Sequence, residues 1–174
     1  AMMAYREAIE KSGSKYIGFV PDFGCFATKP NKPHWDEALK NGADLRLLEM
    51  ARDMRYDAVP MEEAQKRLKE NGATTLELAL LQEMYAFLQF KKDCKKELEG
   101  LKEIMPYCFH MHGKFHYLYE DLTEASIPYE EILHVVKESD YNGYIDSEYE
   151  DHESGNALLM TSRHQQMMRK ILEK

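Results

Sequence analysis

Residues 107–112 read YCFHMH, a run of apolar and aromatic residues that favours a buried β-strand. Two similar runs lie elsewhere in the chain, YIGFV at 16–20 and YIDSEY at 144–149. Helical patterns separate the three runs, and strands joined through helices lie parallel with right-handed crossovers. The sequence therefore predicts an α/β fold built on a short parallel sheet.

Helical patterns fill most of the remaining chain, and residues 25–105 are mostly helical after a loop at 25–34. We expect a short strand at 116–119 and helices at 2–12, 44–54, 60–70, 75–98, 128–139 and 156–173. A closed (β/α)₈ barrel needs eight strands, so three strands predict only part of one. The expected fold is a single domain, residues 1–174, that forms half a TIM barrel with parallel strands and a helical insertion.

Composition excludes several classes of partner. The 174 residues carry a net charge of −8, which disfavours binding to a phosphate backbone, so we expect no nucleic-acid partner. No apolar run reaches the roughly 18 residues of a membrane span, and no signal-peptide pattern is present, so we expect no membrane partner. Cys25, Cys94 and Cys108 form no CxxC pair, which indicates a reducing, cytoplasmic environment.

Side chains that can bind metal lie at the end of each predicted strand. Asp22 follows the first strand, His110 and His112 lie in the second, and Glu148 and Glu150 belong to the third. The carboxyl ends of parallel barrel strands meet at one rim, so Asp22, His112 and Glu148 should lie together. One imidazole and two carboxylates suit a divalent ion such as Mn²⁺, Mg²⁺, Co²⁺ or Zn²⁺.

The alternation of a strand adds neighbours to this group. Residues two apart share a face, so His110 and Lys114 should point the same way as His112, and Asp146 and Glu150 the same way as Glu148. Each residue taken alone also has a simpler interpretation, as a turn or capping carboxylate or as a hydrogen-bonded structural histidine. Glu150 is interpreted as part of a solvent-exposed loop edge. The hypothesis of a metal site depends on the coincidence at three strand ends.

Three segments together resemble the last third of xylose-isomerase-like sugar isomerase/epimerase barrels. They are HMHGKF (110–115), IPYEEILHVVKESDYNGY (127–144) and IDSEYEDH (145–152). In that superfamily a strand ending in H-x-H-x-K precedes a helix that begins at proline, and G-Y-x-G-x-I-x-x-E follows. The segment IGFVPDFG (17–24) is similar to the superfamily's strand that ends in a metal-binding aspartate.

This resemblance implies a metal-dependent sugar isomerase or epimerase whose ion is held by Asp22, His112 and Glu148. Glu148 would also act as the base that removes a proton from the carbon next to a metal-bound carbonyl of the sugar substrate. Lys114 would be a cation that contacts the substrate, and His110 or His116 would supply further polar contacts.

Two positions depart from the family pattern. The superfamily's first metal ligand is a glutamate on an earlier strand, which would precede residue 2. Many members also have histidine three residues after the aspartate, where this chain has Cys25, which we interpret as a buried structural thiol rather than a ligand for a soft metal. The site is therefore expected to be incomplete in this chain alone.

Several alternatives stay open. SEYEDH (147–152) is similar to a branch that cleaves C-glycosides of oxidised sugars with a small partner subunit, which makes a lyase subunit possible. The abasic-site endonuclease branch fits least, because it uses more histidine ligands and a basic surface. A non-catalytic half-barrel fragment is the alternative from another class. Because half a barrel leaves sheet edges open, we expect a homo-oligomer or assembly with a missing N-terminal half.

Overall fold

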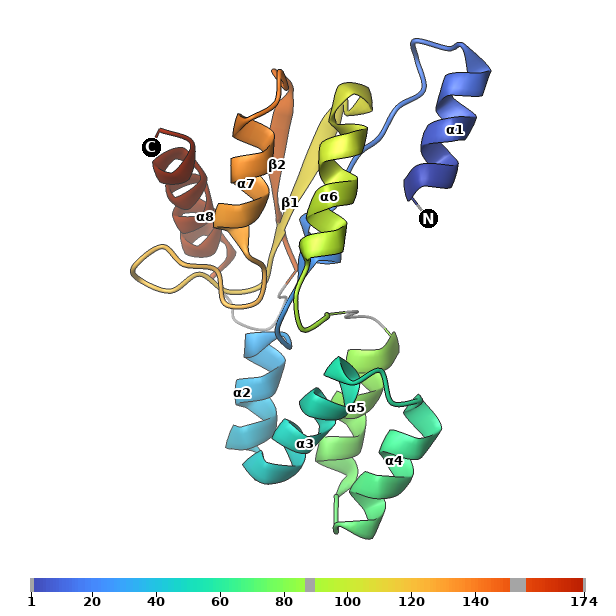
Figure 1. The fold of residues 1–174 in the computed structure, drawn as a ribbon. Helices are drawn as coiled ribbons and strands as arrows, with labels where there is room; N and C mark the ends of the chain where they lie inside the picture. Colours follow the sequence, from blue (N-terminus) through green and yellow to red (C-terminus); the bar gives the residue numbers. More distant parts are fainter. Residues whose placement is uncertain (1, 87–89, 151–155, 174) are drawn as a thin grey trace.

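The computed structural model describes residues 2–86, 90–150 and 156–173, and these form two parts (Figure 1). One part holds the two parallel strands with the helices that pack on them, and the other is a group of four helices, α2 to α5. The helices are α1 (Met2–Ser12), α2 (Lys32–Lys40), α3 (Leu45–Tyr56), α4 (Met61–Glu70), α5 (Thr75–Ala86), α6 (Lys95–Ile104), α7 (Tyr129–Lys137) and α8 (Ala157–Leu172). The strands are β1 (His110–Phe115) and β2 (Tyr144–Tyr149), and the 3₁₀ turns are η1 (Phe23–Phe26) and η2 (Met105–Tyr107).

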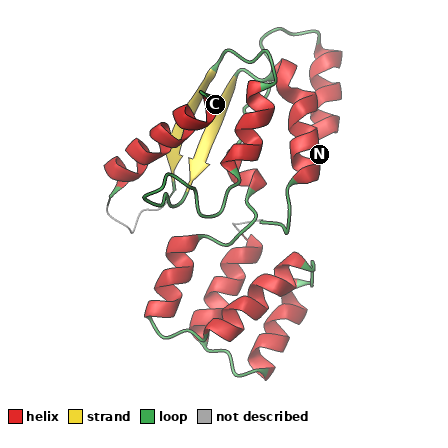
Figure 2. Cartoon of the chain, turned by 60° about the vertical axis from the view of Figure 1, so that its left-hand side comes forward, coloured by secondary structure: helices red, strands yellow, loops and turns green. Residues whose placement is uncertain are grey.

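The two strands confirm a partial α/β fold with a parallel sheet. β1 pairs with β2 so that His112 lies opposite Asp146 and Lys114 lies opposite Glu148. The arrowheads of both strands point toward the part formed by α2 to α5 (Figure 2). The helices inserted after residue 22 therefore stand at the carboxyl end of the sheet, which is the end that carries the predicted site.

The predicted strand at 16–20 is wrong as a regular strand, although the segment lies along β1. Phe19 forms an isolated parallel bridge with Cys108, and Asp22, just after the segment, forms another with His112. The carbonyl of Pro21 accepts a hydrogen bond from the His112 N–H at 2.9 Å. Because proline has no N–H, it cannot return a bond to β1, and the ladder is interrupted there.

The other strand predictions are confirmed in part. β2 occupies the predicted residues 144–149, whereas β1 begins three residues later than the predicted 107–112. Pro106 lies in the 3₁₀ turn η2, which takes up Tyr107, the first position of the predicted strand. The short strand expected at 116–119 is reduced to one antiparallel bridge, Leu118 with Glu124.

The long helix predicted at 75–98 is wrong, because the chain forms two helices there. α5 ends at Ala86 and α6 begins at Lys95, while the expected stripe residues Phe87 and Leu88 lie outside the described residues. After this break Phe90 is fully buried, and the Lys91 N–H donates to the carbonyl of Ala27 at 3.1 Å. The break thus returns the chain from the helical part to the sheet.

Of two further helices, one begins earlier than predicted and the other begins where it was predicted. α2 begins at Lys32, inside the predicted loop, because the Asn31 side chain caps it by accepting from the His34 N–H at 3.2 Å. Asp44 caps α3 as predicted and accepts from the Arg46 N–H at 2.8 Å. Among the described helices, none has both the length and the apolar character needed to cross a lipid bilayer.

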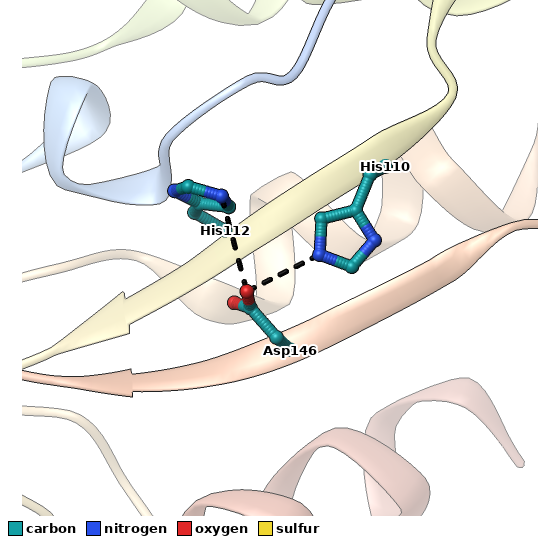
Figure 3. Close-up of side chains that lie close together, drawn as sticks. All are labelled: His110, His112 and Asp146. Carbon is teal, nitrogen blue, oxygen red and sulfur yellow. Dashed lines mark hydrogen bonds and ion pairs between the residues drawn. The ribbon is translucent and has the colours of Figure 1, made fainter.

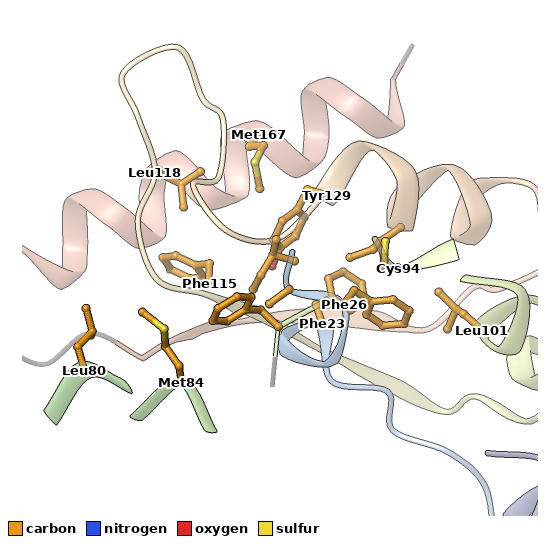
Figure 4. Close-up of a cluster of buried hydrophobic side chains, with 14 of the residues drawn as sticks. Phe23, Phe26, Leu80, Met84, Cys94, Leu101, Phe115, Leu118, Tyr129 and Met167 are labelled. Carbon is orange, nitrogen blue, oxygen red and sulfur yellow. The ribbon is translucent and has the colours of Figure 1, made fainter. Parts of the chain in front are cut away.

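One continuous buried cluster joins the two parts of the structure (Figure 4). Met111 and Phe115 of β1 are fully buried on the face that packs against α7 and α8. Phe23 packs edge-on against Tyr129 of α7, with ring centroids 5.4 Å apart. The helical part adds Leu81 and Met84 of α5 to the same cluster. The sheet therefore has one face covered by apolar helices, and its polar side chains lie on the other face.

Glu77 joins the starts of two helices in the helical part. It is 1% exposed, and its carboxylate accepts from the N–H of Thr74 at 2.8 Å, from the Thr74 hydroxyl at 2.6 Å and from the N–H of Asp44 at 2.7 Å. The Thr74 hydroxyl in turn accepts from the Leu76 N–H at 3.2 Å, which completes a capping box. Burial alone would raise the pKa of Glu77, but these hydrogen bonds outweigh it and hold the pKa at about 2.

We predict that Glu77→Gln lowers the free energy of unfolding by about 1–3 kcal/mol at pH 7, because an amide cannot accept all three bonds. The pKa of Glu77 is depressed from 4.5 in the folded state, so its contribution is complete above pH 4.5 and declines as the pH falls toward 2. Urea denaturation of both proteins from pH 7 to pH 3.5 should show the difference shrinking below pH 4.5. Glu70→Gln, at an exposed position, is the control, and an equal loss in that variant would contradict the prediction.

Candidate metal site

The sheet face opposite the buried helices carries a group of titratable side chains. Along β1, exposure alternates, with Met111 and Phe115 buried and His110, His112 and Lys114 on the other face. The register with β2 places Asp146 and Glu148 beside this row. The parallel bridge between Asp22 and His112 adds a third segment to it. Backbone pairing thus places these three segments side by side.

Three of these residues could hold a metal ion, namely His110, His112 and Asp146 (Figure 3). The Asp146 Oδ2 atom lies 3.2 Å from the His110 Nε2 atom and 3.9 Å from the His112 Nε2 atom. The Oδ1 atom accepts from the N–H of Gly113 at 3.2 Å, which fixes the carboxylate. One ligand atom from each residue falls within 4.8 Å of the others, a spacing compatible with one shared cation.

A second group lies toward the carboxyl ends and has Lys114 at its centre. The Lys114 Nζ atom is 2.8 Å from Asp22 Oδ2, 2.9 Å from Glu150 Oε1 and 3.8 Å from Glu148 Oε2. Burial lowers the pKa of Lys114, but the bonds to Asp22 and Glu150 prevail and raise it above its usual value. Lys114 is therefore a charged ammonium group that partly neutralises the carboxylates around it.

Glu148 has one carboxylate oxygen that lacks a hydrogen-bond donor among the described residues. Its Oε2 atom is buried and accepts no hydrogen bond from the described residues, although the His112 Nδ1 atom lies 3.7 Å away. Burial raises the pKa of Glu148, and the charges of Lys114 and His112 oppose that rise. This oxygen, with the His112 imidazole at 3.7 Å and the Lys114 ammonium at 3.8 Å, faces groups that a negative charge attracts.

Asp22 is held in place by the turn that follows it. Its Oδ1 atom caps η1 by accepting from the Gly24 N–H at 2.8 Å, which leaves Oδ2 directed at Lys114. A side chain at Gly24 would meet the Lys114 Cδ atom at 2.7 Å, so glycine permits the close approach of the lysine. The interpretation of Asp22 as a capping residue is confirmed, and the same cap aims its second oxygen into the group.

Some site predictions need correction. Cys25 is exposed rather than buried, because Phe23 and Phe26 take the buried positions of the short turn. His116 is only 2% exposed, so a direct contact with substrate is not favoured there. Glu150 is an exposed residue directly after β2, as expected, and it is also an ion-pair partner of Lys114. Its place two residues after Glu148 was the signal that could have identified it.

A buried hydrogen-bonded chain supports the site from behind the sheet. Tyr129 of α7 donates its hydroxyl to the carbonyl of Lys114 at 2.7 Å and lies 2.6 Å from the His164 Nε2 atom. The other ring nitrogen of His164 lies 2.9 Å from the Ser147 hydroxyl, and the ring stacks on Phe115 at 4.2 Å. Because the tyrosine hydroxyl already donates, His164 carries its proton on Nε2 and accepts from Ser147. This chain links both strands to α7 and α8.

The comparisons with known proteins are consistent with carbohydrate chemistry. No family model matches the sequence. The chain is 28% identical to the 3'-dehydrocarminate deglycosidase alpha subunit of Microbacterium sp, over 86% of this chain and 45% of that protein. It is 25% identical to a C-glycoside deglycosidase alpha subunit of Arthrobacter globiformis, over 99% of this chain and 51% of that protein. A second Arthrobacter globiformis protein of the same name is 42% identical over 30% of this chain and 14% of its own length.

The chain spans about half the length of the first two relatives. Their names describe alpha subunits, so these relatives belong to assemblies of more than one subunit. The resemblance to the C-glycoside-cleaving branch is supported at this level.

We predict that the His164 ring makes stability depend on pH between 6.5 and 4.5. Burial lowers the pKa of His164 from 6.5 to about 3, so the unfolded chain takes up a proton more readily than the folded protein. The free energy of unfolding should therefore decline as the pH falls below 6.5, in a range above that in which Glu77 acts. His164→Phe should be less stable at pH 7 by about 1–3 kcal/mol, and its stability should vary less between pH 6.5 and 4.5.

The matched control for this measurement is His134→Phe, because His134 is exposed on α7. Chemical denaturation of the three proteins at several pH values gives the comparison. An unchanged pH dependence in His164→Phe would show that the buried ring does not set it.

Proposed function

We propose that this chain is part of the alpha subunit of a metal-dependent enzyme that cleaves C-glycosides, with Asp22, His112 and Glu148 as metal ligands. The observation that carries the proposal is the buried Glu148 oxygen, which accepts no hydrogen bond from the described residues and lies 3.7 Å from the His112 Nδ1 atom, while Asp22 pairs with His112 through the backbone. The names of the relatives support the reaction class. Mn²⁺, Mg²⁺, Co²⁺ and Zn²⁺ are the candidate ions.

The ion would polarise a sugar oxygen and stabilise the negative charge that develops on it. In a sugar with a carbonyl at the 3' carbon, the proton on the neighbouring carbon is acidic. Glu148 would remove this proton, because its carboxylate lies on the same sheet face as His112 and can act as a general base there. The bond from the sugar to the aglycone lies one carbon further and can then break, and the departing aglycone takes up a proton.

Two other residues would bind the sugar on this face. The Lys114 ammonium lies between the carboxylates, where it could contact a sugar oxygen in place of one of them. His110 lies at the opposite end of the row and is partly exposed, so its ring can reach a hydroxyl group. We propose both as substrate-contacting groups.

An isomerase or epimerase remains the second candidate function, because it needs the same ion and the same removal of a proton beside a carbonyl. It follows from the motifs H-x-H-x-K and I-x-x-E, whereas the relatives' names favour cleavage. The products distinguish the two reactions, since only cleavage releases an aglycone.

The open sheet supports completion of the site by another polypeptide. Tyr144 is 81% exposed and Phe109 is 53% exposed near the amino ends of the strands, and Ile17 and Val20 are also exposed on the neighbouring segment. We propose that the missing half of a barrel, or a second copy of this chain, covers these residues. The half-length match to the relatives favours a missing half. A non-catalytic fragment is the alternative if neither restores a reaction. The unpaired cysteines fit a cytoplasmic location.

The proposal can be tested by joining this chain to the half of the Microbacterium relative that lies outside the match. The fusion, loaded with Mn²⁺, should release the aglycone of 3'-dehydrocarminate when the partner subunit of the relative is added. Mass spectrometry of the products measures the reaction. Glu148→Gln should abolish release, because an amide can neither remove the proton nor balance the charge of the ion.

Glu120→Gln is the matched control, since the Glu120 side chain is 92% exposed and lies outside the site. Metal content after gel filtration is measured in parallel. A folded, metal-loaded fusion that isomerises a sugar without releasing aglycone would favour the second candidate. Equal activity in Glu148→Gln and the control would rule out the proposed role of Glu148.

A further inference from the structure

We propose that this sheet face has a second, overlapping metal position, formed by His110, His112 and Asp146, which prefers zinc-type ions. It lies nearer the amino ends of the strands than the position proposed above, and the two positions share His112. This inference does not need the proposed reaction, because it concerns only which ions the face binds and where.

The position is preorganised by the backbone. The N–H of Gly113 holds one oxygen of Asp146 and leaves the other oxygen between the two imidazole rings. The rings of His110 and His112 stand nearly perpendicular, at 78°, with centroids 5.7 Å apart. Figure 3 shows both rings directed at Asp146 from the neighbouring strand. All three side chains are about 40% exposed, so an ion can reach them from solvent.

The ring of His112 lies between the two positions. Its Nε2 atom is 3.9 Å from Asp146, and its Nδ1 atom is 3.7 Å from Glu148. A neutral imidazole has one nitrogen with a free lone pair, and its other nitrogen carries a proton. An ion bound at Nε2 therefore leaves an Nδ1–H group facing Glu148, and an ion bound at Nδ1 leaves an Nε2–H group facing Asp146. The two positions consequently exclude each other.

The two ligand sets should select different ions. Two imidazoles and one carboxylate form a ligand set typical of Zn²⁺, whereas a set rich in carboxylates with one imidazole suits Mn²⁺ or Mg²⁺. The ammonium group of Lys114 already pairs with Asp22 and Glu150, so an ion entering the carboxylate-rich position must compete with it. His110 and Asp146 lack such a cation at hydrogen-bonding distance among the described side chains. Zn²⁺ should therefore occupy the His110–His112–Asp146 position.

The test measures Zn²⁺ and Mn²⁺ affinities of the 174-residue chain and its variants, with Zn²⁺ by competition with a chromophoric chelator and Mn²⁺ by electron paramagnetic resonance. His110→Ala and Asp146→Asn should weaken Zn²⁺ binding by at least about 10-fold and leave Mn²⁺ binding within about twofold. Asp22→Asn and Glu148→Gln should show the reverse pattern. His112→Ala should weaken both, and added Zn²⁺ should displace Mn²⁺ competitively.

His134→Ala is the matched control, because this exposed histidine lies on α7 away from the face, and circular dichroism confirms folding of each variant. Zn²⁺ affinity that falls in Glu148→Gln but not in His110→Ala or Asp146→Asn would overturn the second position and leave the proposed function intact. Simultaneous binding of both ions would overturn the shared role of His112. Mn²⁺ binding that is absent, or insensitive to Asp22→Asn and Glu148→Gln, would contradict the ligand set of the proposed function, while the Zn²⁺ results still decide the second position.

Discussion

The parallel register of three backbone segments is the constraint on which the rest of the structure depends. His112 pairs with the Asp22 segment on one side and lies opposite Asp146 on the other. Because side chains alternate along a strand, this register sends every second residue of β1 toward the polar face and the intervening ones into the core. A shift by one residue would place Met111 on the open face and bury His112. The buried side chains of the helix-covered face therefore also fix the position of the polar side chains.

Charge balance is the second feature that shapes the face. Asp22, Glu148 and Glu150 surround the single ammonium group of Lys114, and Asp146 stands further along beside two imidazoles. Lys114 neutralises only part of this negative charge, so the face retains an attraction for cations. The helices α2 to α5 lie at the carboxyl end of the sheet (Figure 2).

Sequence reasoning succeeded where local patterns determine structure. β2, the capped helix α3 and the helix that follows Pro128 were predicted close to their observed bounds, because alternation, caps and proline act within a few residues. The irregular segment at 16–20 was predicted as a regular strand. Pro21 interrupts its pairing, because proline has no N–H to donate to β1, which lies far away in the sequence. The break after Ala86 was missed because it depends on packing of Phe90 and on the bond from Lys91 to Ala27.

The same distinction applies to the site. The positions of Asp22, His112 and Glu148 at strand ends predict that they lie at one rim, and the His112 Nδ1 atom lies 3.7 Å from Glu148 Oε2. The salt bridge of Lys114 with Glu150 and the buried chain through His164 and Tyr129 required the packed structure, because they join residues far apart in sequence. His164 lies in an amphipathic helix, and nothing in its sequence neighbours indicates that its ring connects two strands.

We propose above that His112 belongs to a metal site on the open face of the sheet. The most direct measurement is an anomalous difference map from a crystal of the chain grown with Mn²⁺ and recorded near the manganese absorption edge. We expect a peak about 2.0–2.3 Å from a ring nitrogen of His112, with Glu148 and Asp22 as further ligands. Peaks confined to exposed carboxylates away from this face, with His112 bound to no ion, would contradict it.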